Sequence, residues 1–178
     1  DMIGDFGRAH RLDHAILRYF NAAGADPEGE LVERHDPEPH LIPRVLMAAL
    51  GLTEEFRIFG DSYATADGTC VRDFIHVTDL ADGHVRTLDR LLTTGQSLTV
   101  NLGTGRGSSI RDVIRACEAC VGHAIPSRVV AGREGDPPVL VANPERARRE
   151  LGFIPHRSDL PTIVETAISA LKQVHNLT

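Results

Sequence analysis

The sequence predicts a single α/β or α+β domain, residues 1–178, in which strands alternate with helices. Two observations support this class. Short β-rich runs alternate along the chain with segments whose apolar residues recur at helical spacing and whose ends carry capping residues. Hydrophobic residues make up 42% of the 178 residues, which is enough to bury a sizeable core, and no internal repeat or linker divides the chain.

The first third of the chain predicts two strands on either side of a helix. Pro43 in the first turn of that helix and Gly51 after its end occupy positions where these residue types are favoured. The expected elements are a buried strand at 14–20 that ends at 21–24, a surface loop at 25–39, a helix at 40–50 and a short strand at 56–59.

Residues 67–82, DGTCVRDFIHVTDLAD, predict a turn and a β-rich run that leads directly into a helix. Thr78 is the expected N-cap, and Asp79 and Asp82 are expected in the first turn, where carboxylates favour the positive end of the helix dipole. Arg72 lies where a guanidinium can bind an anionic ligand. It can equally be a buried structural residue paired with Asp73, and the local sequence leaves both alternatives open.

The second half of the chain predicts two more strands and three helices. Residues 103–107 have the spacing G-x-G-x-G rather than G-x-G-x-x-G, and no acidic residue ends a second strand about 20 residues later, so we expect a tight turn rather than a dinucleotide fingerprint. The expected elements are a helix to about residue 92, a strand at 97–102, a helix begun by Ser108 or Ser109, a strand at 127–130, a short helix from Asn143-Pro144 to Gly152, and a final helix capped by Ser158.

Charge and composition narrow the function classes. Nineteen basic against twenty-five acidic residues give a net charge of −6, and no basic stretch is dense enough for a nucleic-acid surface. No run approaches the roughly 20 apolar residues of a membrane-spanning helix. The start of the chain lacks the pattern of a signal peptide. We therefore expect a cytoplasmic protein without nucleic-acid or membrane partners.

Three cysteines, an odd number, argue against a disulfide framework. Cys117 and Cys120 form a C-x-x-C motif that suggests redox or zinc chemistry, but they lie in a stripe of apolar residues at helical spacing, and a second cysteine pair for zinc is missing. We predict that both are buried core residues. His76 and His84 can face one another on successive elements, but a structural role is favoured, so no metal site is expected.

Three arginines in turn-flanked segments, Arg57, Arg72 and Arg133, suit a diphosphate if they converge, because bidentate guanidinium contacts to phosphate are strong and directional. No P-loop, nucleophile elbow or H-E-x-x-H motif is present. Six segments then appear in order: LRYFNAAGADPEGE (17–30), HLIP (40–43), IFG (58–60), DGTCVRDFIHVTDLADGH (67–84), NLGTGRGSSI (101–110) and REGDPP (133–138). Together they resemble the C-terminal half of the UDP-glucose 4-epimerases, which are extended short-chain dehydrogenases/reductases.

The resemblance implies the C-terminal substrate-binding part of a Rossmann-type α/β enzyme, with residues 14–24 as a remnant strand of the Rossmann sheet and the dinucleotide-binding part missing. It implies a UDP-sugar substrate, with NAD bound mainly by the missing part. The implied contacts are Phe20 beside the nicotinamide, Asn21, His40 and Leu41 near the sugar and diphosphate, Arg57, Ile58 and Phe59 at the uracil, Arg72 and Arg133 on the diphosphate, Glu134, Gly135 and Asp136 at the ribose, and Leu140 beside the hexose.

In this family a tyrosine base and NAD transiently oxidise the sugar C4, and the 4-keto sugar turns before the hydride returns. The chain lacks the Tyr-x-x-x-Lys pair for this step, since neither Tyr19 nor Tyr63 is followed by lysine at that spacing. We therefore expect an isomerase by family that is inactive as this chain alone, with no catalytic residue of its own; the family's homodimer is not expected to form. The alternatives are a related NAD-dependent nucleotide-sugar epimerase or dehydratase, a non-catalytic nucleotide-sugar binding domain, or half of a split enzyme.

Overall fold

A computed structural model describes residues 2–177, and its fold belongs to the predicted α/β class. The helices are α1 (Met2–His10), α2 (Leu41–Ala49), α3 (Val77–Thr94), α4 (Ile110–Val121), α5 (Glu145–Leu151) and α6 (Leu160–His175). The strands are β1 (Ala15–Tyr19), β2 (Asn21–Ala23), β3 (Phe56–Phe59), β4 (Val71–Arg72), β5 (Phe74–His76), β6 (Leu98–Leu102), β7 (Ser108–Ser109), β8 (Ser127–Val130) and β9 (Val139–Leu140). No helix within this range is long and apolar enough to cross a membrane.

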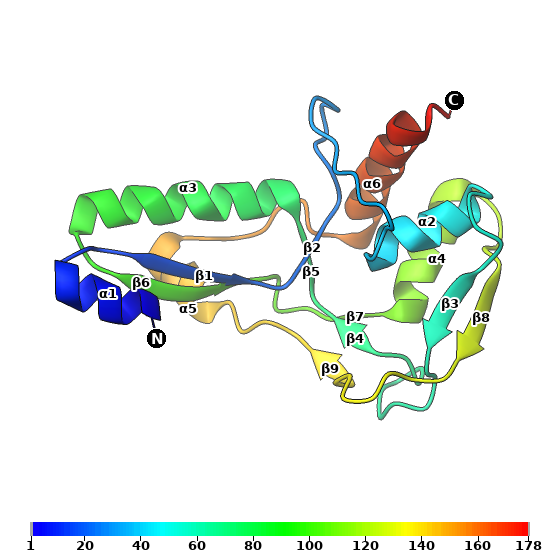
Figure 1. The fold of residues 1–178 in the computed structure, drawn as a ribbon, viewed down its shortest axis with the longest axis horizontal. Helices are drawn as coiled ribbons and strands as arrows, with labels where there is room; N and C mark the ends of the chain where they lie inside the picture. Colours follow the sequence, from blue (N-terminus) through cyan, green and yellow to red (C-terminus); the bar gives the residue numbers. More distant parts are fainter. Residues whose placement is uncertain (1, 178) are drawn as a thin grey trace.

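The strands pair mostly in parallel. The parallel pairs are β1 with β6, β2 with β5, and β3 with β8, while β4 lies between antiparallel β7 and parallel β9. Figure 1 shows an elongated molecule with β1, β6, α1, α3 and α5 at one end and β3, β8, α2, α4 and α6 at the other. The paired strands β2 and β5 lie between the two ends (Figure 1).

The strand predicted at 14–20 is confirmed as β1, which ends at Tyr19. Residues 21–24 were predicted only to end that strand, but residues 21–23 form the separate short strand β2, so that part of the prediction is wrong. The backbone N–H of Phe20 donates to Leu102 (3.3 Å), and the next N–H, that of Asn21, donates to Asp73 (3.0 Å). The chain thus changes its hydrogen-bonding partner from β6 to β5 at Phe20. The expected burial is also wrong at the end of β1, where Arg18 and Tyr19 are exposed.

Each end of the molecule has its own hydrophobic core. One core is formed by apolar faces of α2, α4 and α6 against β3, with Leu46, Val113 and Ile163 among its fully buried side chains. The other lies between β6, α3 and α5 and includes Leu102 and Phe153. The predicted amphipathic faces of α4 and α6 therefore account for much of the first core.

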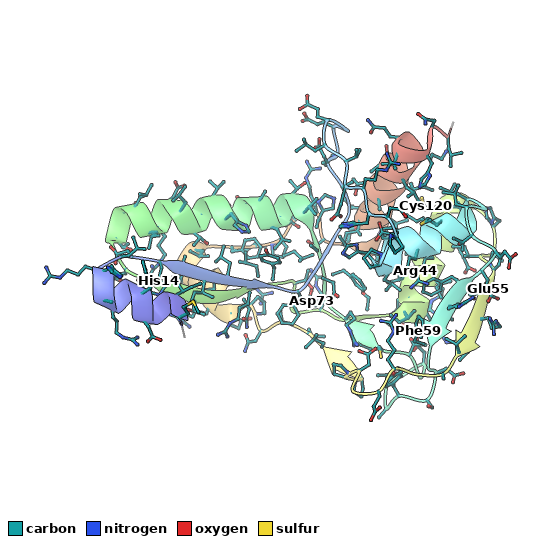
Figure 2. All side chains as sticks on the ribbon, viewed as in Figure 1. His14, Arg44, Glu55, Phe59, Asp73 and Cys120 are labelled. Atoms are coloured by element: carbon teal, nitrogen blue, oxygen red, sulfur yellow. The ribbon has the colours of Figure 1, made fainter. Side chains whose placement is uncertain are left out.

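A buried carboxylate connects the segments between these two cores. The Asp73 side chain is fully buried and accepts hydrogen bonds from the Thr104 N–H (3.0 Å), the Thr104 hydroxyl (2.6 Å), the Gly105 N–H (3.0 Å) and the Ala142 N–H (3.1 Å). Figure 2 places Asp73 near the middle of the molecule. The G-x-G-x-G segment is thus a tight turn, as predicted, and its Thr104 and Gly105 N–H groups donate to the Asp73 carboxylate. The alternative that paired Asp73 with Arg72 is wrong.

Two helix caps differ from the prediction. His76, not Thr78, caps α3, because its ring accepts the Thr78 N–H (3.1 Å). Asp159, not Ser158, caps α6. Asp79 lies in the first turn of α3, as predicted. Its buried carboxylate accepts the Ser158 hydroxyl (2.5 Å) and the backbone N–H groups of His156 and Arg157, in the loop before α6.

Two further predictions in helices are wrong. Asp82 lies beyond the first turn of α3 and pairs with Arg86 at 2.6 Å. Cys120 is exposed, whereas Cys117 is buried as predicted, and burial raises the pKa of the Cys117 thiol to about 12. The buried stripe of α4 runs through Val113, Ile114 and Cys117, and Cys120 lies outside it.

His76 makes stability depend on pH. Burial lowers the pKa of its imidazole, and its two ring nitrogens contact Thr78 N–H and the Thr166 hydroxyl (3.0 Å). A histidine with a lowered pKa in the folded state binds fewer protons than in the unfolded chain, so the free energy of unfolding falls as pH decreases through about 6.5. We expect His76→Asn, which can still cap α3, to flatten urea-unfolding stability between pH 7 and 5. An unchanged slope would contradict this assignment.

Candidate functional site

A cavity of about 220 Å³ lies between α2, β3, the Cys70–Phe74 segment and the loop after β8. It brings together residues that are far apart in the sequence, and it has both apolar and charged walls. The residues of the expected site that line it are Asn21, Leu41, Arg57, Phe59, Arg72, Arg133 and Asp136. Arg57, Arg72 and Arg133 thus line one cavity, which is the condition under which they suit a diphosphate.

The cavity has a positive balance of charge. Four arginines line it, since Arg44 of α2 joins Arg57, Arg72 and Arg133, and Asp136 is its only acidic lining residue. Figure 2 shows Arg44 and Phe59 on the same side of the molecule, with Glu55 farther out. Several guanidinium groups around one small cavity favour a ligand with more than one negative charge.

Arg72 is the most firmly positioned of these arginines. Its Nη1 donates to the carbonyl oxygens of Val71 (2.9 Å) and Pro137 (2.8 Å), and its Nη2 forms an ion pair with Asp136. The side chain is only 13% exposed. Its Nε–H and one Nη2 hydrogen have no partner in the described chain, so donors remain for an anion in the cavity.

Arg133 is fixed in another way. Its guanidinium carbon lies 4.1 Å from the centre of the Phe59 ring, which is within the range of a cation–π contact. Phe59 ends β3, so the arginine of the loop after β8 is positioned by the neighbouring strand. The residue itself is exposed, and its guanidinium is open to solvent and to a ligand.

Tyr63 packs where the two loops beside Phe59 and Arg133 meet. A side chain at Gly60 would lie 2.8 Å from the Tyr63 ring, and one at Gly132 would lie 3.2 Å from its hydroxyl, so both glycines permit close packing. Gly60 also has φ of 82°, which a side chain disfavours. Burial, together with the neighbouring Cys70, raises the pKa of the Tyr63 phenol.

Asn21 lies where β1 passes into β2. Its backbone N–H and its side-chain amide both donate to the Asp73 carbonyl, at 3.0 and 2.9 Å. The carboxamide is therefore held in one orientation with its oxygen left as an acceptor. A second cavity of about 300 Å³ shares Asn21, Leu41 and Phe74 with the first and is also lined by Phe20 and His40.

Four residues of the expected site line neither of these cavities. Ile58 is 3% exposed and belongs to the core formed with α2 and α4. Glu134 and Gly135 are exposed on the turn that ends at Asp136, and Leu140 is 47% exposed on β9. Any contact of these residues with a ligand is still a prediction.

Sequence reasoning missed several lining residues, and Arg44 is the most informative. It follows Leu41 by three residues on α2, a spacing that places both on one helix face, so the signal was available once Leu41 was assigned to the site. Its backbone N–H donates to the His40 carbonyl (3.2 Å), but its side chain has no hydrogen bond or ion pair within residues 2–177. The other missed lining residues are Pro39, Phe56, Cys70, Phe74 and Ile110.

The two histidines considered for a metal have separate partners. His76 contacts Thr78 and Thr166, whereas His84 Nδ1 contacts the Leu80 carbonyl (2.8 Å) and its ring lies 5.9 Å from that of Tyr19. The structural role that the sequence favours for both is therefore consistent with their contacts.

Known proteins resemble this chain over nearly its whole length. It is 50% identical over 159 residues to a UDP-glucose 4-epimerase from Halalkalibacterium halodurans, covering 89% of this chain and 48% of that protein. The crystal structure of the Brucella ovis UDP-glucose 4-epimerase in complex with NAD matches with a TM-score of 0.91 and 50% identity over 96% of this chain and 52% of that one.

The crystal structure of the UDP-glucose 4-epimerase from Stenotrophomonas maltophila, with bound NAD and formylated UDP-arabinopyranose, matches with a TM-score of 0.93 and 37% identity, covering 98% of this chain and 52% of that one. The chain thus spans about half the length of the relatives that it matches. Residues 1–103 match the model of the NAD dependent epimerase/dehydratase family. The fold, the sequence identity and this match show that the chain belongs to the NAD dependent epimerase/dehydratase family.

Proposed function

We propose that this chain is the UDP-sugar-binding part of a UDP-hexose 4-epimerase, an isomerase that interconverts UDP-glucose and UDP-galactose. The observation that carries the proposal is the convergence of four arginines and Asn21 on one cavity. The similarity to UDP-glucose 4-epimerases at 50% identity supports it. A UDP-sugar has the required chemistry, since its diphosphate is doubly charged and lies between a flat base and a polar sugar.

The cavity suggests how UDP is bound. Arg72 and Arg133 bind the diphosphate, with Arg44 as a further cation on the opposite wall formed by α2. The uracil lies against Arg57 and Phe59, and the ribose lies beside the turn at Glu134–Asp136. Asn21, His40 and Leu41 lie toward the sugar, where the second cavity adjoins the first.

The residues of this chain do not fit a complete NAD site. The glycine-rich turn after β6 uses the amides of Thr104 and Gly105 for Asp73, so these amides cannot bind a pyrophosphate. Phe20 is the only cofactor contact that we propose. The 178 residues also contain no Tyr-x-x-x-Lys pair. The proposed role of this chain is therefore to bind and orient UDP, while hydride transfer depends on groups that the chain does not contain.

Comparison of UDP with uridine tests the proposed binding site. We expect calorimetric titration of the 178-residue chain to show saturable binding of UDP that is at least about tenfold tighter than binding of uridine, because two or more charge-assisted hydrogen bonds go to the diphosphate. Affinity should fall as salt screens the exposed Arg57 and Arg133. Equal affinity for UDP and uridine would contradict the diphosphate assignment.

A coupled assay with UDP-galactose, NAD and this chain tests whether the chain alone catalyses the epimerisation. We expect no conversion to UDP-glucose above background, while a full-length UDP-glucose 4-epimerase in the same assay converts it. Conversion by the chain alone would show that a base other than a Tyr-Lys pair acts here.

A further inference from the structure

A cluster of metal-binding side chains lies outside the cavity, on the loop that precedes α2. Glu33, His35 and His40 are all exposed, and one potential ligand atom of each lies within 4.8 Å of the others. The rings of His35 and His40 are 4.8 Å apart between centroids. The cluster adjoins the second cavity, which Glu33 and His40 both line, but none of its three residues lines the 220 Å³ cavity proposed for UDP.

The side chains of this cluster already contact one another. A carboxylate oxygen of Glu33 lies 2.7 Å from His35 Nε2. Glu38 lies 2.8 Å from His40 Nδ1 and also accepts the His40 backbone N–H at 2.7 Å. Glu38 is the less exposed partner, at 14% against 49% for His40. The backbone and ring contacts together fix the orientation of the His40 imidazole.

The contact with Glu38 matters for ligation. When His40 donates a proton from Nδ1 to the Glu38 carboxylate, its Nε2 carries the lone pair and is available to a metal ion. A carboxylate that receives the second ring N–H of a histidine is the usual support of a metal-bound imidazole, because it fixes the tautomer and increases the basicity of the ligand. This arrangement distinguishes the cluster from a chance group of exposed acids.

We propose that Glu33, His35 and His40 bind one divalent transition-metal ion, such as Zn²⁺ or Co²⁺, with Glu38 as the residue that orients His40. Two imidazoles and one carboxylate are a donor set that these ions accept, and water completes the coordination. Metal–ligand bonds of about 2.0–2.2 Å place neighbouring ligand atoms roughly 3.4 Å apart. Ligand atoms that lie up to 4.8 Å apart therefore approach one another on binding, whereas the Glu33 oxygen and His35 Nε2, now 2.7 Å apart, separate slightly to admit the ion.

The surrounding backbone limits where this movement occurs. The Asp26 carboxylate accepts the N–H groups of Glu30 (2.9 Å) and Leu31 (3.1 Å), which fixes the start of the segment, and α2 begins at Leu41. The closure is thus confined to residues 32–40. The same segment lines a cavity of about 670 Å³ that Arg44 also lines.

A bound ion would also fix the rim of the candidate UDP site. Pro39 and Leu41 line the 220 Å³ cavity, and His40 lies between them. Metal binding at His40 orders the segment that leads into α2, so the ion stabilises the rim without contacting UDP.

Titration of the 178-residue chain with Co²⁺ tests the proposal. We use Cys120→Ser as the background, because Cys120 is exposed and is a rival ligand. We expect one saturable site whose visible absorption shows nitrogen and oxygen ligands and no thiolate-to-cobalt charge-transfer band. His35→Gln and His40→Gln should each weaken binding more than about tenfold, and Glu38→Gln by about tenfold.

His123→Gln is the matched control, because His123 is exposed and lies outside the cluster. It should bind Co²⁺ like the background protein, and circular dichroism should show all variants folded. Equal Co²⁺ affinity of the background protein and the double variant His35→Gln/His40→Gln would overturn the proposal, as would the absence of saturable binding.

Discussion

Replacing Asp73 by alanine is expected to lower the free energy of unfolding by about 3–5 kcal/mol. The change removes a fully buried carboxylate and takes the acceptor from the backbone N–H groups of Thr104, Gly105 and Ala142. The Thr104 hydroxyl loses its shorter bond, to Asp73 (2.6 Å), and keeps the Arg106 carbonyl (3.1 Å). For a chain of this size the midpoint of thermal unfolding should fall by roughly 6–20 °C. Because typical domains are stable by only about 5–15 kcal/mol, this is among the largest losses a single substitution can cause here.

Two further variants separate the hydrogen bonds of Asp73 from nonspecific effects. Asp73→Asn keeps the shape and one acceptor oxygen but turns an NH₂ group toward some of the donors, so its loss should be intermediate. Asp89→Ala removes an exposed carboxylate of α3 and should change stability by less than about 0.5 kcal/mol. If Asp73→Ala unfolds at the temperature of Asp89→Ala, Asp73 does not connect the two ends of the molecule.

Local sequence patterns predicted well the bounds of the elements that have four or more residues. The bounds of β3 and β8 agree with the prediction, and α2 and β6 differ from it by one residue at their ends. Each of these elements carries its own periodicity and its own end signals. The capping box of α4, in which Ser109 and Asp112 bond one another's backbone N–H groups, is a further local signal that places the start of the helix correctly.

Features that depend on distant partners were missed. The strands β4, β7 and β9 have two residues each and are defined by their pairing with one another. Two residues are too few to show the alternating pattern that predicts a strand. The continuation of β1 into β2 depends on the place where β6 ends and β5 begins. Ser158 has the residue type of a cap, but Asp79 takes its hydroxyl, so the neighbouring Asp159 caps the helix instead.

In the candidate site, too, local sequence predicted the residue types, whereas distant pairing determines how they come together. Residue type and turn context were enough to select Arg57, Arg72 and Arg133, but their convergence follows from the parallel pairing of β3 with β8 and of β4 with β9. The pairing of β4 with β9 within one sheet also brings Asp136, shortly before β9, to Arg72, which therefore pairs with Asp136 and not with its neighbour Asp73. Sequence adjacency is a poor guide here, because successive side chains of a strand point to opposite faces.

Replacing Arg72 by alanine is expected to weaken UDP binding by about 10- to 100-fold, the largest effect on affinity that we predict for this site. A charge-assisted hydrogen bond to phosphate is worth about 1.5–3 kcal/mol, and each 1.4 kcal/mol is a factor of ten. Calorimetric titration with UDP measures the change. Arg115→Ala, on the exposed surface of α4 away from the cavity, should bind UDP like the unsubstituted chain.

The ion pair with Asp136 complicates this result, and a second variant resolves it. Arg72→Ala leaves the Asp136 carboxylate in the cavity without its partner, where it repels a diphosphate. If repulsion caused the loss, Arg72→Ala/Asp136→Asn would regain most of the affinity. If Arg72 donates directly to the phosphate, the double variant stays weak and Arg72→Lys, which keeps the charge but loses the planar fork, recovers only part of it. An affinity of Arg72→Ala within about twofold of the unsubstituted chain would remove Arg72 from the site, because loss of one direct charge-assisted bond must exceed that change.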